Sequence, residues 1–126
     1  MPEDPPIKLS QMFFEMGEII LEPKMPCQGA FLIEAGSVEV YRMVGDRKIV
    51  VAILDKGEIF GEVAMVDNVP HVRYVRALEG TSCLMITNSQ YRTLYDQTPA
   101  IMKLFLARLV RKLRKTTDIA FGKTTI

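Results

Sequence analysis

The sequence predicts a mainly β domain, an antiparallel sandwich or jelly-roll barrel, followed by a long C-terminal helix. Short apolar segments separated by turn residues fill the region from Gly17 to Ile86, and glycines recur between them at roughly regular spacing. Many short strands joined by glycine turns are typical of closed or sandwiched antiparallel sheets. The last third of the chain changes to helical periodicity. With 126 residues, of which 48% are hydrophobic and 25% charged, the chain has the size and composition of one globular domain.

Residues 1–8 are predicted to form a flexible N-terminal arm, because the first six residues are acidic and rich in proline. A short helix is predicted from Leu9 to about Met16, where apolar side chains follow helical spacing. The acidic start is unlike a signal peptide, and no uncharged apolar run approaches the roughly 20 residues that span a bilayer. We therefore expect a cytoplasmic protein without membrane contact.

Six short strands are predicted in the central region: Ile19–Leu21, Gly29–Ile33, Ser37–Met43, Lys48–Leu54, Tyr74–Ala77 and Ser82–Ile86. In the third of these, Val38, Val40 and Arg42 alternate with Glu39, Tyr41 and Met43, as in a strand with one face in water. Gly45 and Asp46 then form a two-residue hairpin signal before the next strand.

Two helices are predicted after the strands. Ser89–Asp96 is a short helix with Asn88 or Ser89 as its N-cap, and a long helix starts with Thr98 as N-cap and Pro99 at its first position. The long helix carries an apolar stripe of Met102, Phe105 or Leu106, Leu109 and Leu113. The domain thus divides into a barrel with short flanking helices, residues 9–97, and a long helix with a tail, residues 98–126.

The net charge of +1 conceals an uneven distribution. Residues 1–100 hold fourteen acids and nine bases, whereas residues 101–126 hold seven bases and one acid. A 20-residue helix is about 30 Å long, which exceeds the width of a small barrel. Part of the apolar stripe must therefore pack against something other than the barrel. A homodimer formed through this helix is therefore expected. The basic face is interpreted as solvated, with non-specific phosphate contact as the alternative.

Few residues are available for catalysis or metal binding. The two cysteines, Cys27 and Cys83, have no metal-ligand spacing and are expected to be free thiols, and His71 is the single histidine. An enzyme on a cupin-like barrel would need a metal cluster or an acid–base pair, which one histidine does not supply in any usual set. The sequence favours a protein that is not an enzyme and holds no metal.

The segment between the fourth and fifth predicted strands carries the most distinctive chemistry. Phe60–Met65 is short, apolar and contains Gly61, so a turn of helix there would present free backbone N–H groups to an anion. Glu62 is an acid beside an apolar run, placed to accept hydrogen bonds from a ligand hydroxyl. From this pattern alone, a plain glycine turn with a solvated glutamate is the simpler interpretation.

Three motifs together resemble the cyclic nucleotide-binding domain of catabolite-activator-type regulators, protein kinase A regulatory subunits and gated channels. They are Gly17-Glu-Ile-Ile, Ala30-Phe-Leu-Ile-Glu-Ala-Gly-Ser-Val-Glu-Val and Gly57-Glu-Ile-Phe-Gly-Glu-Val-Ala-Met, and the resemblance covers about residues 9–115. It implies a β-roll of eight strands, a double-stranded β-helix or jelly roll, flanked by helices. It also implies a cyclic nucleotide, cAMP or cGMP, as the ligand.

The resemblance assigns roles to particular residues. Gly61 would lie against the cyclic phosphate, Glu62 would take the ribose 2′-hydroxyl, and the amides of Val63 and Ala64 would point at the phosphate or ribose. Thr116 and Thr117 stand where catabolite-activator-like proteins have adjacent hydroxyl residues that reach the adenine from both subunits.

The chain departs from the family pattern where a proline is followed by the arginine that pairs with the phosphate. Here His71, Val72 and Arg73 follow Pro70, so an imidazole that is mostly neutral at pH 7 replaces the guanidinium. That loss is expected to cost roughly 100-fold in affinity. Either Arg73 compensates, since positions 71 and 73 share a strand face about 6.6 Å apart, or it fills the pocket and pairs with Glu62.

These alternatives give two hypotheses for function. The first is a non-enzymatic sensor that binds cAMP, cGMP or a related nucleotide and relays binding through the C-terminal helix. The second is a degenerate fold without a nucleotide ligand, acting as a protein-interaction or dimerisation module. The regulators that it resembles continue into a helix-turn-helix, whereas this sequence ends at Ile126, so sequence-specific DNA binding is not expected. The downstream protein partner is unknown.

Overall fold

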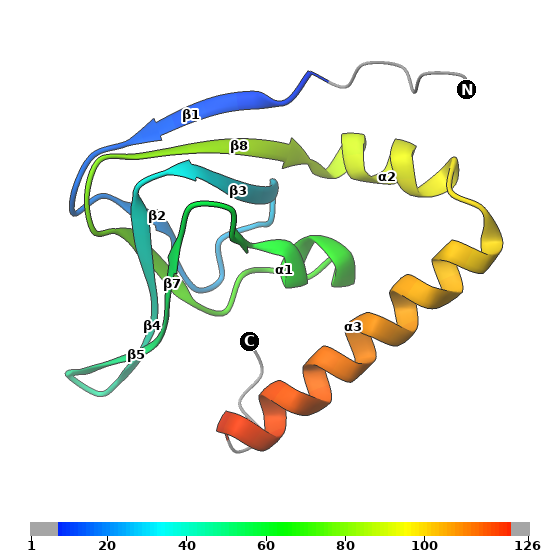
Figure 1. Ribbon diagram of the computed structural model, residues 1–126. Coiled ribbons are helices and arrows are strands. Elements are labelled where there is room, and N and C mark those ends of the chain that lie inside the picture. The colour runs from blue at the N-terminus through cyan, green and yellow to red at the C-terminus, as the bar shows by residue number, and fades with distance from the viewer. Residues whose placement is uncertain (1–7, 122–126) are drawn as a thin grey trace.

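A computed structural model describes residues 8–121, and within that range the side chains of Arg114 and of residues 116–121 are not described. The predicted arm at residues 1–8 therefore lies outside the described residues, apart from Lys8. Two antiparallel sheets and three helices make up the fold (Figure 1). In chain order these elements are β1 (Ser10–Phe14), β2 (Ile19–Leu21), β3 (Gly29–Ala35), β4 (Ser37–Val44), β5 (Arg47–Asp55), β6 (Ile59–Phe60), α1 (Glu62–Asp67), β7 (Tyr74–Ala77), β8 (Thr81–Thr87), α2 (Asn88–Asp96) and α3 (Ala100–Phe121).

Successive strands lie in different sheets of the two four-stranded sheets, except for β4 and β5, which form a hairpin within one sheet. One sheet has the order β1-β8-β3-β6 and the other β2-β7-β4-β5, and every pairing is antiparallel. Strands that are distant in sequence thus become neighbours, as a jelly roll requires. The predicted fold class, mainly β with flanking helices and a long C-terminal helix, is confirmed.

The core lies between the sheets and is apolar. Phe31 stacks on Phe60 with ring centroids 4.9 Å apart, and Phe14 meets Phe31 edge-on at 6.2 Å. Burial of each such aromatic side chain contributes roughly 1.5–3 kcal/mol. The buried core cluster comprises Phe14, Ile20, Leu21, Phe31, Ile33, Val38, Val40, Phe60, Val75, Ala77 and Cys83. Cys27 and Cys83 are free thiols, as predicted.

The helix predicted from Leu9 to Met16 is wrong, because this segment contains strand β1. Its backbone pairs with β8, with Gln11 opposite Leu84 and Phe14 opposite Thr81. Exposure alternates along the strand, so that Phe13 is 67% exposed while Phe14 is buried. Apolar residues at this spacing fit a short helix or a strand equally well, and pairing with β8 together with burial of Phe14 decides for the strand.

The six predicted strands are confirmed, with bounds that differ by no more than two residues at an end, and β2 and β7 have the predicted bounds. Strand β6 was not predicted because it is only two residues long.

The expectation that Glu39 and Tyr41 face water is wrong. Lys48 forms an ion pair with Glu39 and covers the ring of Tyr41, which also stacks on Tyr74, so both side chains on this outer face are buried.

Helix α2 packs against β8 and β3, and its N-cap is Thr87 instead of Asn88 or Ser89. The Thr87 hydroxyl accepts from the Gln90 amide at 3.2 Å, and the Gln90 side chain accepts from the Thr87 amide at 2.9 Å. This capping box satisfies two backbone donors at the helix start. The Asn88 side chain instead donates to the Cys27 carbonyl at 2.6 Å and ties the loop before β3 to α2.

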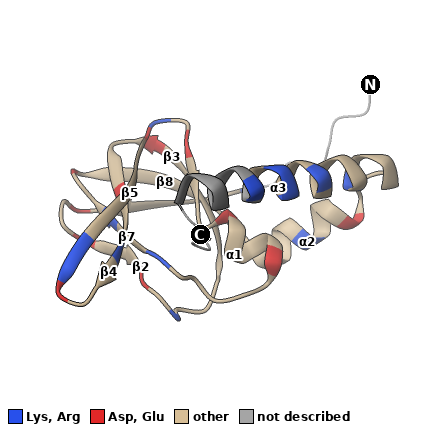
Figure 2. Ribbon diagram, turned by 90° about the horizontal axis from the view of Figure 1, so that it is seen from below, with Lys and Arg blue, Asp and Glu red and all other residues tan. Residues whose placement is uncertain are grey.

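Helix α3 begins at Ala100, beyond the end of α2, and its ribbon runs back on the side of α1 (Figure 1). The Thr98 hydroxyl donates to the Leu94 carbonyl at 2.8 Å, so it completes α2 and does not provide the predicted cap for α3. The apolar side chains of α3 are largely exposed, namely Ile101, Met102, Leu104, Phe105, Leu106, Leu109 and Leu113. Figure 2 shows Lys and Arg recurring along the described part of α3. Within the described residues, no helix is both long and apolar enough to span a membrane.

Candidate functional site

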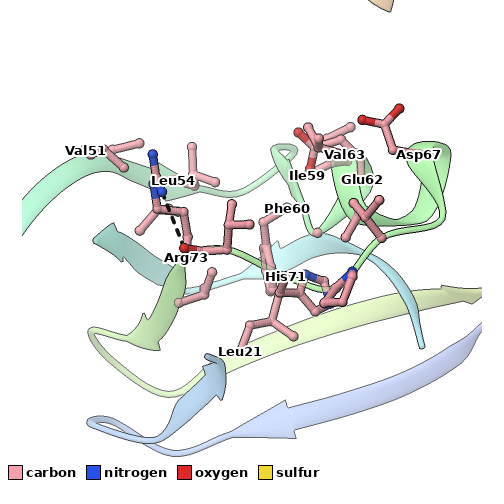
Figure 3. A pocket seen from close by; sticks show the side chains of 18 residues that line it. Leu21, Val51, Leu54, Ile59, Phe60, Glu62, Val63, Asp67, His71 and Arg73 are labelled. Atoms are coloured by element: carbon pink, nitrogen blue, oxygen red, sulfur yellow. Dashed lines mark hydrogen bonds between the residues drawn. The ribbon is translucent and has the colours of Figure 1, made fainter. Parts of the chain in front are cut away.

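A cavity of about 360 Å³ opens beside helix α1 and strand β5 (Figure 3). This volume is in the usual range for a small-molecule site. Seven predicted site residues line it together: Gly61, Glu62, Val63, Ala64, His71, Val72 and Arg73. The predicted Thr116 and Thr117 fall within the bounds of α3, but their side chains lie outside the described residues.

Gly61 fixes the start of α1 at the cavity. It is the N-cap of the helix, with φ 80° and ψ 0°, a left-handed conformation that favours glycine. A Cβ at this position would lie 3.3 Å from the Gly29 carbonyl oxygen and 3.4 Å from Cε1 of His71. The first-turn amides of α1, including those of Val63 and Ala64, have no intrahelical acceptor because they begin the helix. Glycine therefore allows α1 to present backbone donors close to β3 and His71.

Glu62 is a half-buried acid in the wall of the cavity. Burial raises the pKa of its carboxyl group, and a hydrogen bond from its own backbone N–H partly opposes this rise. No side-chain donor among the described residues binds this carboxyl group. Glu62 is thus available to accept a hydrogen bond from a ligand hydroxyl.

His71 is buried, and backbone hydrogen bonds to the loop before β3 fix its position. Its N–H donates to the Met25 carbonyl at 3.1 Å, and its carbonyl accepts from the Lys24 amide at 2.8 Å. Burial lowers the pKa of the imidazole, so the side chain is neutral at pH 7. The position at which the family has an arginine therefore carries no charge here.

Arg73 lines the cavity on the side of β5, beside Val51 and Leu54, whereas Glu62 lies on the other side (Figure 3). Its Nη1 donates to the Val72 carbonyl at 3.4 Å. Burial and the charge of nearby Arg42 lower the pKa of Arg73. No ion pair joins Arg73 to Glu62, both of which are described residues, so the alternative in which the two pair is wrong, and the cavity is open with Arg73 in its wall.

The sequence alone did not show the apolar wall opposite α1 or the proximity of Arg42 to Arg73. Strand β4 contributes Val40 to the wall, and β5 contributes Val51, Ala52 and Leu54. The alternation of Val38, Val40 and Arg42 was a usable signal, because it places Arg42 on the inner face of β4. Nothing in the sequence alone specified which residue of β7 or its approach would face Arg42.

Metal binding has no support among the described residues, where no three His, Cys, Asp or Glu side chains come together as a ligand group. The cavity offers instead backbone amides, two acids (Glu62 and Asp67), one neutral imidazole and one guanidinium on mostly apolar walls. Such a combination suits a small organic anion that has hydroxyl groups.

A comparison with protein families agrees with this geometry. The family model for the cyclic nucleotide-binding domain matches residues 11–98, most of the chain. The chain belongs to the cyclic nucleotide-binding domain family. The suspected resemblance is therefore confirmed, and the motif at Gly57–Met65 corresponds to strand β6 and helix α1 at the cavity.

Similar proteins include regulators and a larger enzyme. The cyclic AMP receptor protein of Thermus thermophilus is 29% identical over 89 residues, which are 70% of this chain and 41% of the relative. The solved structure of the Thermus thermophilus catabolite activator protein has a TM-score of 0.75 at 25% identity and covers 90% of this chain and 54% of that one. The cAMP-bound form of the EAL enzyme Bd1971 has a TM-score of 0.73 at 29% identity, covering 86% of this chain and 30% of that one. The chain spans about two fifths of the length of the curated relatives.

Proposed function

We propose that this domain is a non-enzymatic sensor that binds a cyclic nucleotide or a related phosphorylated nucleotide in the cavity beside α1. The observation that carries the proposal is that residues of the family's motif line the cavity. Gly61, Glu62, Val63 and Ala64 line its wall on one side, and apolar residues of β4 and β5 line the other. The cAMP-bound and cGMP-bound forms of the EAL enzyme Bd1971 add support, because both are similar in fold to this chain.

The proposed roles follow from the chemistry of each group. Glu62 accepts a hydrogen bond from a ribose hydroxyl, and the first-turn amides of α1 donate to phosphate or ribose oxygens. The apolar side chains of β4 and β5 contact the nucleoside part of the ligand. Thr116 and Thr117 are kept as candidate contacts to the base. The function is binding, and no catalytic role is proposed for any residue.

We further propose that α3 relays binding by pairing with a second copy of the chain. Its apolar stripe is exposed along the described helix, including Phe105 at 58% and Leu109 at 53%. Helix pairing would remove this surface from water, which favours association. The free thiols Cys27 and Cys83 are consistent with a cytoplasmic protein. A downstream protein partner remains to be identified.

Isothermal titration calorimetry with cAMP, cGMP and the corresponding 5′-monophosphates tests the proposed binding. We expect at least one nucleotide to bind in the micromolar range, and Glu62→Gln to weaken it about 10-fold or more, since it removes a charged hydrogen-bond acceptor. Glu22→Gln, which changes an exposed acid outside the cavity, is the matched control and leaves binding unchanged.

The neutral His71 supports one competing function, a fold that no longer binds a nucleotide and serves as an interaction module. The double variant His71→Arg/Arg73→Ala restores the family's arrangement of charge. No binding by the wild type, together with binding by this variant, would reject the sensor and favour the competing function.

A further inference from the structure

Two arginines lie near each other beside paired strands, and one of them, Arg73, lines the cavity. Strands β4 and β7 pair Tyr41 with Tyr74 where β7 begins, so Arg42 and Arg73 are the next residues beyond this last pair. Arg42 lies two residues after Val40, and Arg73 lies two residues before Val75. Because Val40 and Val75 both line the cavity, the period of two puts both arginines on the inner side of the sheet.

The guanidinium of Arg73 has an unused pair of donors. Its Nε and Nη2 are buried and have no hydrogen-bond partner, while only Nη1 donates, to the Val72 carbonyl. Nε and Nη2 form the side edge of the guanidinium, whose parallel N–H groups match two oxygens of a phosphate or carboxylate. Nε of Arg42 is also buried without a partner. Buried donors of this kind are usually paired, so the arrangement is incomplete without an acceptor.

No acid of the described residues neutralises these two charges. Among the described residues, Lys48 forms an ion pair with Glu39, and this pair lies on the outer face of the sheet. The acids in the cavity wall, Glu62 and Asp67, lie on the side away from Arg73 in Figure 3. Two like charges on one face repel each other unless an anion lies between them. An anion that enters the cavity would satisfy these donors and separate the two charges.

The anionic group of a ligand is expected at this end of the cavity because the other end offers less charge. His71 is neutral, and the α1 amides provide hydrogen bonds without a full charge. A cyclic phosphodiester carries one negative charge, whereas a phosphate monoester carries about 1.5 to 2 at pH 7. Only the monoester neutralises both guanidinium groups.

We propose that Arg73, through its Nε–Nη2 edge, and Arg42 form the anion site of the cavity, and that this site selects a nucleoside 5′-monophosphate over the corresponding cyclic nucleotide. The inference rests on the proposed function for the nucleoside part of the ligand. The arginine pair does not depend on that function. In this chain Arg73 and Arg42 would supply the positive charge at the phosphate, in place of the arginine that the family has at position 71.

Competitive calorimetric titration with 5′-AMP, 5′-GMP, cAMP and cGMP tests the selection. We expect the 5′-monophosphate of the preferred base to bind about 10-fold or more tightly than its cyclic counterpart. A cyclic nucleotide that binds as tightly as its monophosphate, or more tightly, would overturn the selection and would leave the proposed function standing.

Variants separate the two arginines. Arg42→Met is expected to bring the affinities for the monophosphate and the cyclic nucleotide within about 3-fold of each other, because one of the two cations is lost. Arg73→Met is expected to weaken both by 10-fold or more, and Arg73→Lys, which keeps the charge and loses the paired donors, gives an intermediate loss. Arg47→Met removes an equal charge from an exposed position on the same hairpin and leaves all affinities unchanged. An unchanged preference in a folded Arg42→Met variant would contradict the proposal.

The anion site can also be tested without a nucleoside. If no nucleotide binds, the proposed function fails. The melting temperature of the protein in inorganic phosphate and in pyrophosphate then tests whether the arginine pair binds an anion. A rise in melting temperature that Arg42→Met and Arg73→Met both abolish, and Arg47→Met retains, supports the site. No rise in the wild type overturns it.

Discussion

The barrel and helix α3 use similar apolar side chains in opposite ways. Phe31 in β3 is 6% exposed and is stacked on Phe60, whereas Phe105 in α3 is 58% exposed. The barrel buries its apolar residues between its own two sheets, so its core is complete within one chain. Helix α3 makes no extensive contact with the sheets, and its apolar stripe has no comparable cover among the described residues. The barrel thus holds the cavity by itself, and α3 is the part suited to contact a second molecule.

The largest expected effect is on the stability of the barrel. Phe31→Ala removes a ring packed against Phe14 and Phe60 and is expected to lower the free energy of unfolding by about 3–5 kcal/mol. Phe105→Ala, the matched change in α3, is expected to lower it by no more than about 0.5 kcal/mol. Urea unfolding at protein concentrations below those at which the chain self-associates measures both. Equal losses would show that α3 is as integral to the fold as β3.

A smaller effect is expected on self-association, and it should be confined to α3. Leu109→Asp places a charge in the exposed apolar stripe and is expected to weaken dimer formation about 10-fold or more, which corresponds to about 1.4 kcal/mol. Analytical ultracentrifugation of the wild type and the variant measures the dissociation constant.

Ile53→Asp is the control for the dimer prediction, because Ile53 is 64% exposed on the barrel, in β5. We expect this variant to dimerise like the wild type. If Ile53→Asp weakens association and Leu109→Asp does not, the contact surface lies on the barrel and the proposed role of α3 is wrong.

The smallest expected effect is a pH dependence of the free energy of unfolding that is caused by the buried His71. Burial lowers the pKa of His71 below its ordinary value of 6.5, so the unfolded chain takes up a proton at a higher pH than the folded chain. The free energy of unfolding should therefore fall as the pH drops through 6.5 towards the folded pKa. His71→Gln removes this contribution, so its stability should fall less between pH 7.5 and 5.5. Denaturant titrations across this range compare the two proteins, and parallel curves would contradict the assigned cause.

Much of the candidate site could be predicted because its residues are close together in the sequence. Gly61 and Glu62 are adjacent, and the turn of helix that follows depends on local conformation, so the motif predicts both the element and its position at a cavity. The same holds for the hairpin at Gly45 and Asp46, which joins β4 to β5 as expected. Arg73 was recognised as a displaced positive charge, but its contacts were not predictable.

What the sequence determined by itself was the set of local preferences: the strand periodicity, the glycine turns, the two C-terminal helices and the motif around Gly61. Only the tertiary structure decided that Leu9–Met16 contains a strand, because its partner β8 lies about 70 residues further along the chain. It likewise brought Arg42 near Arg73, since the register between β4 and β7 depends on how two distant strands bury their apolar faces. Local residue patterns specify which elements can form, whereas pairing and burial between distant segments specify which one does and what it faces.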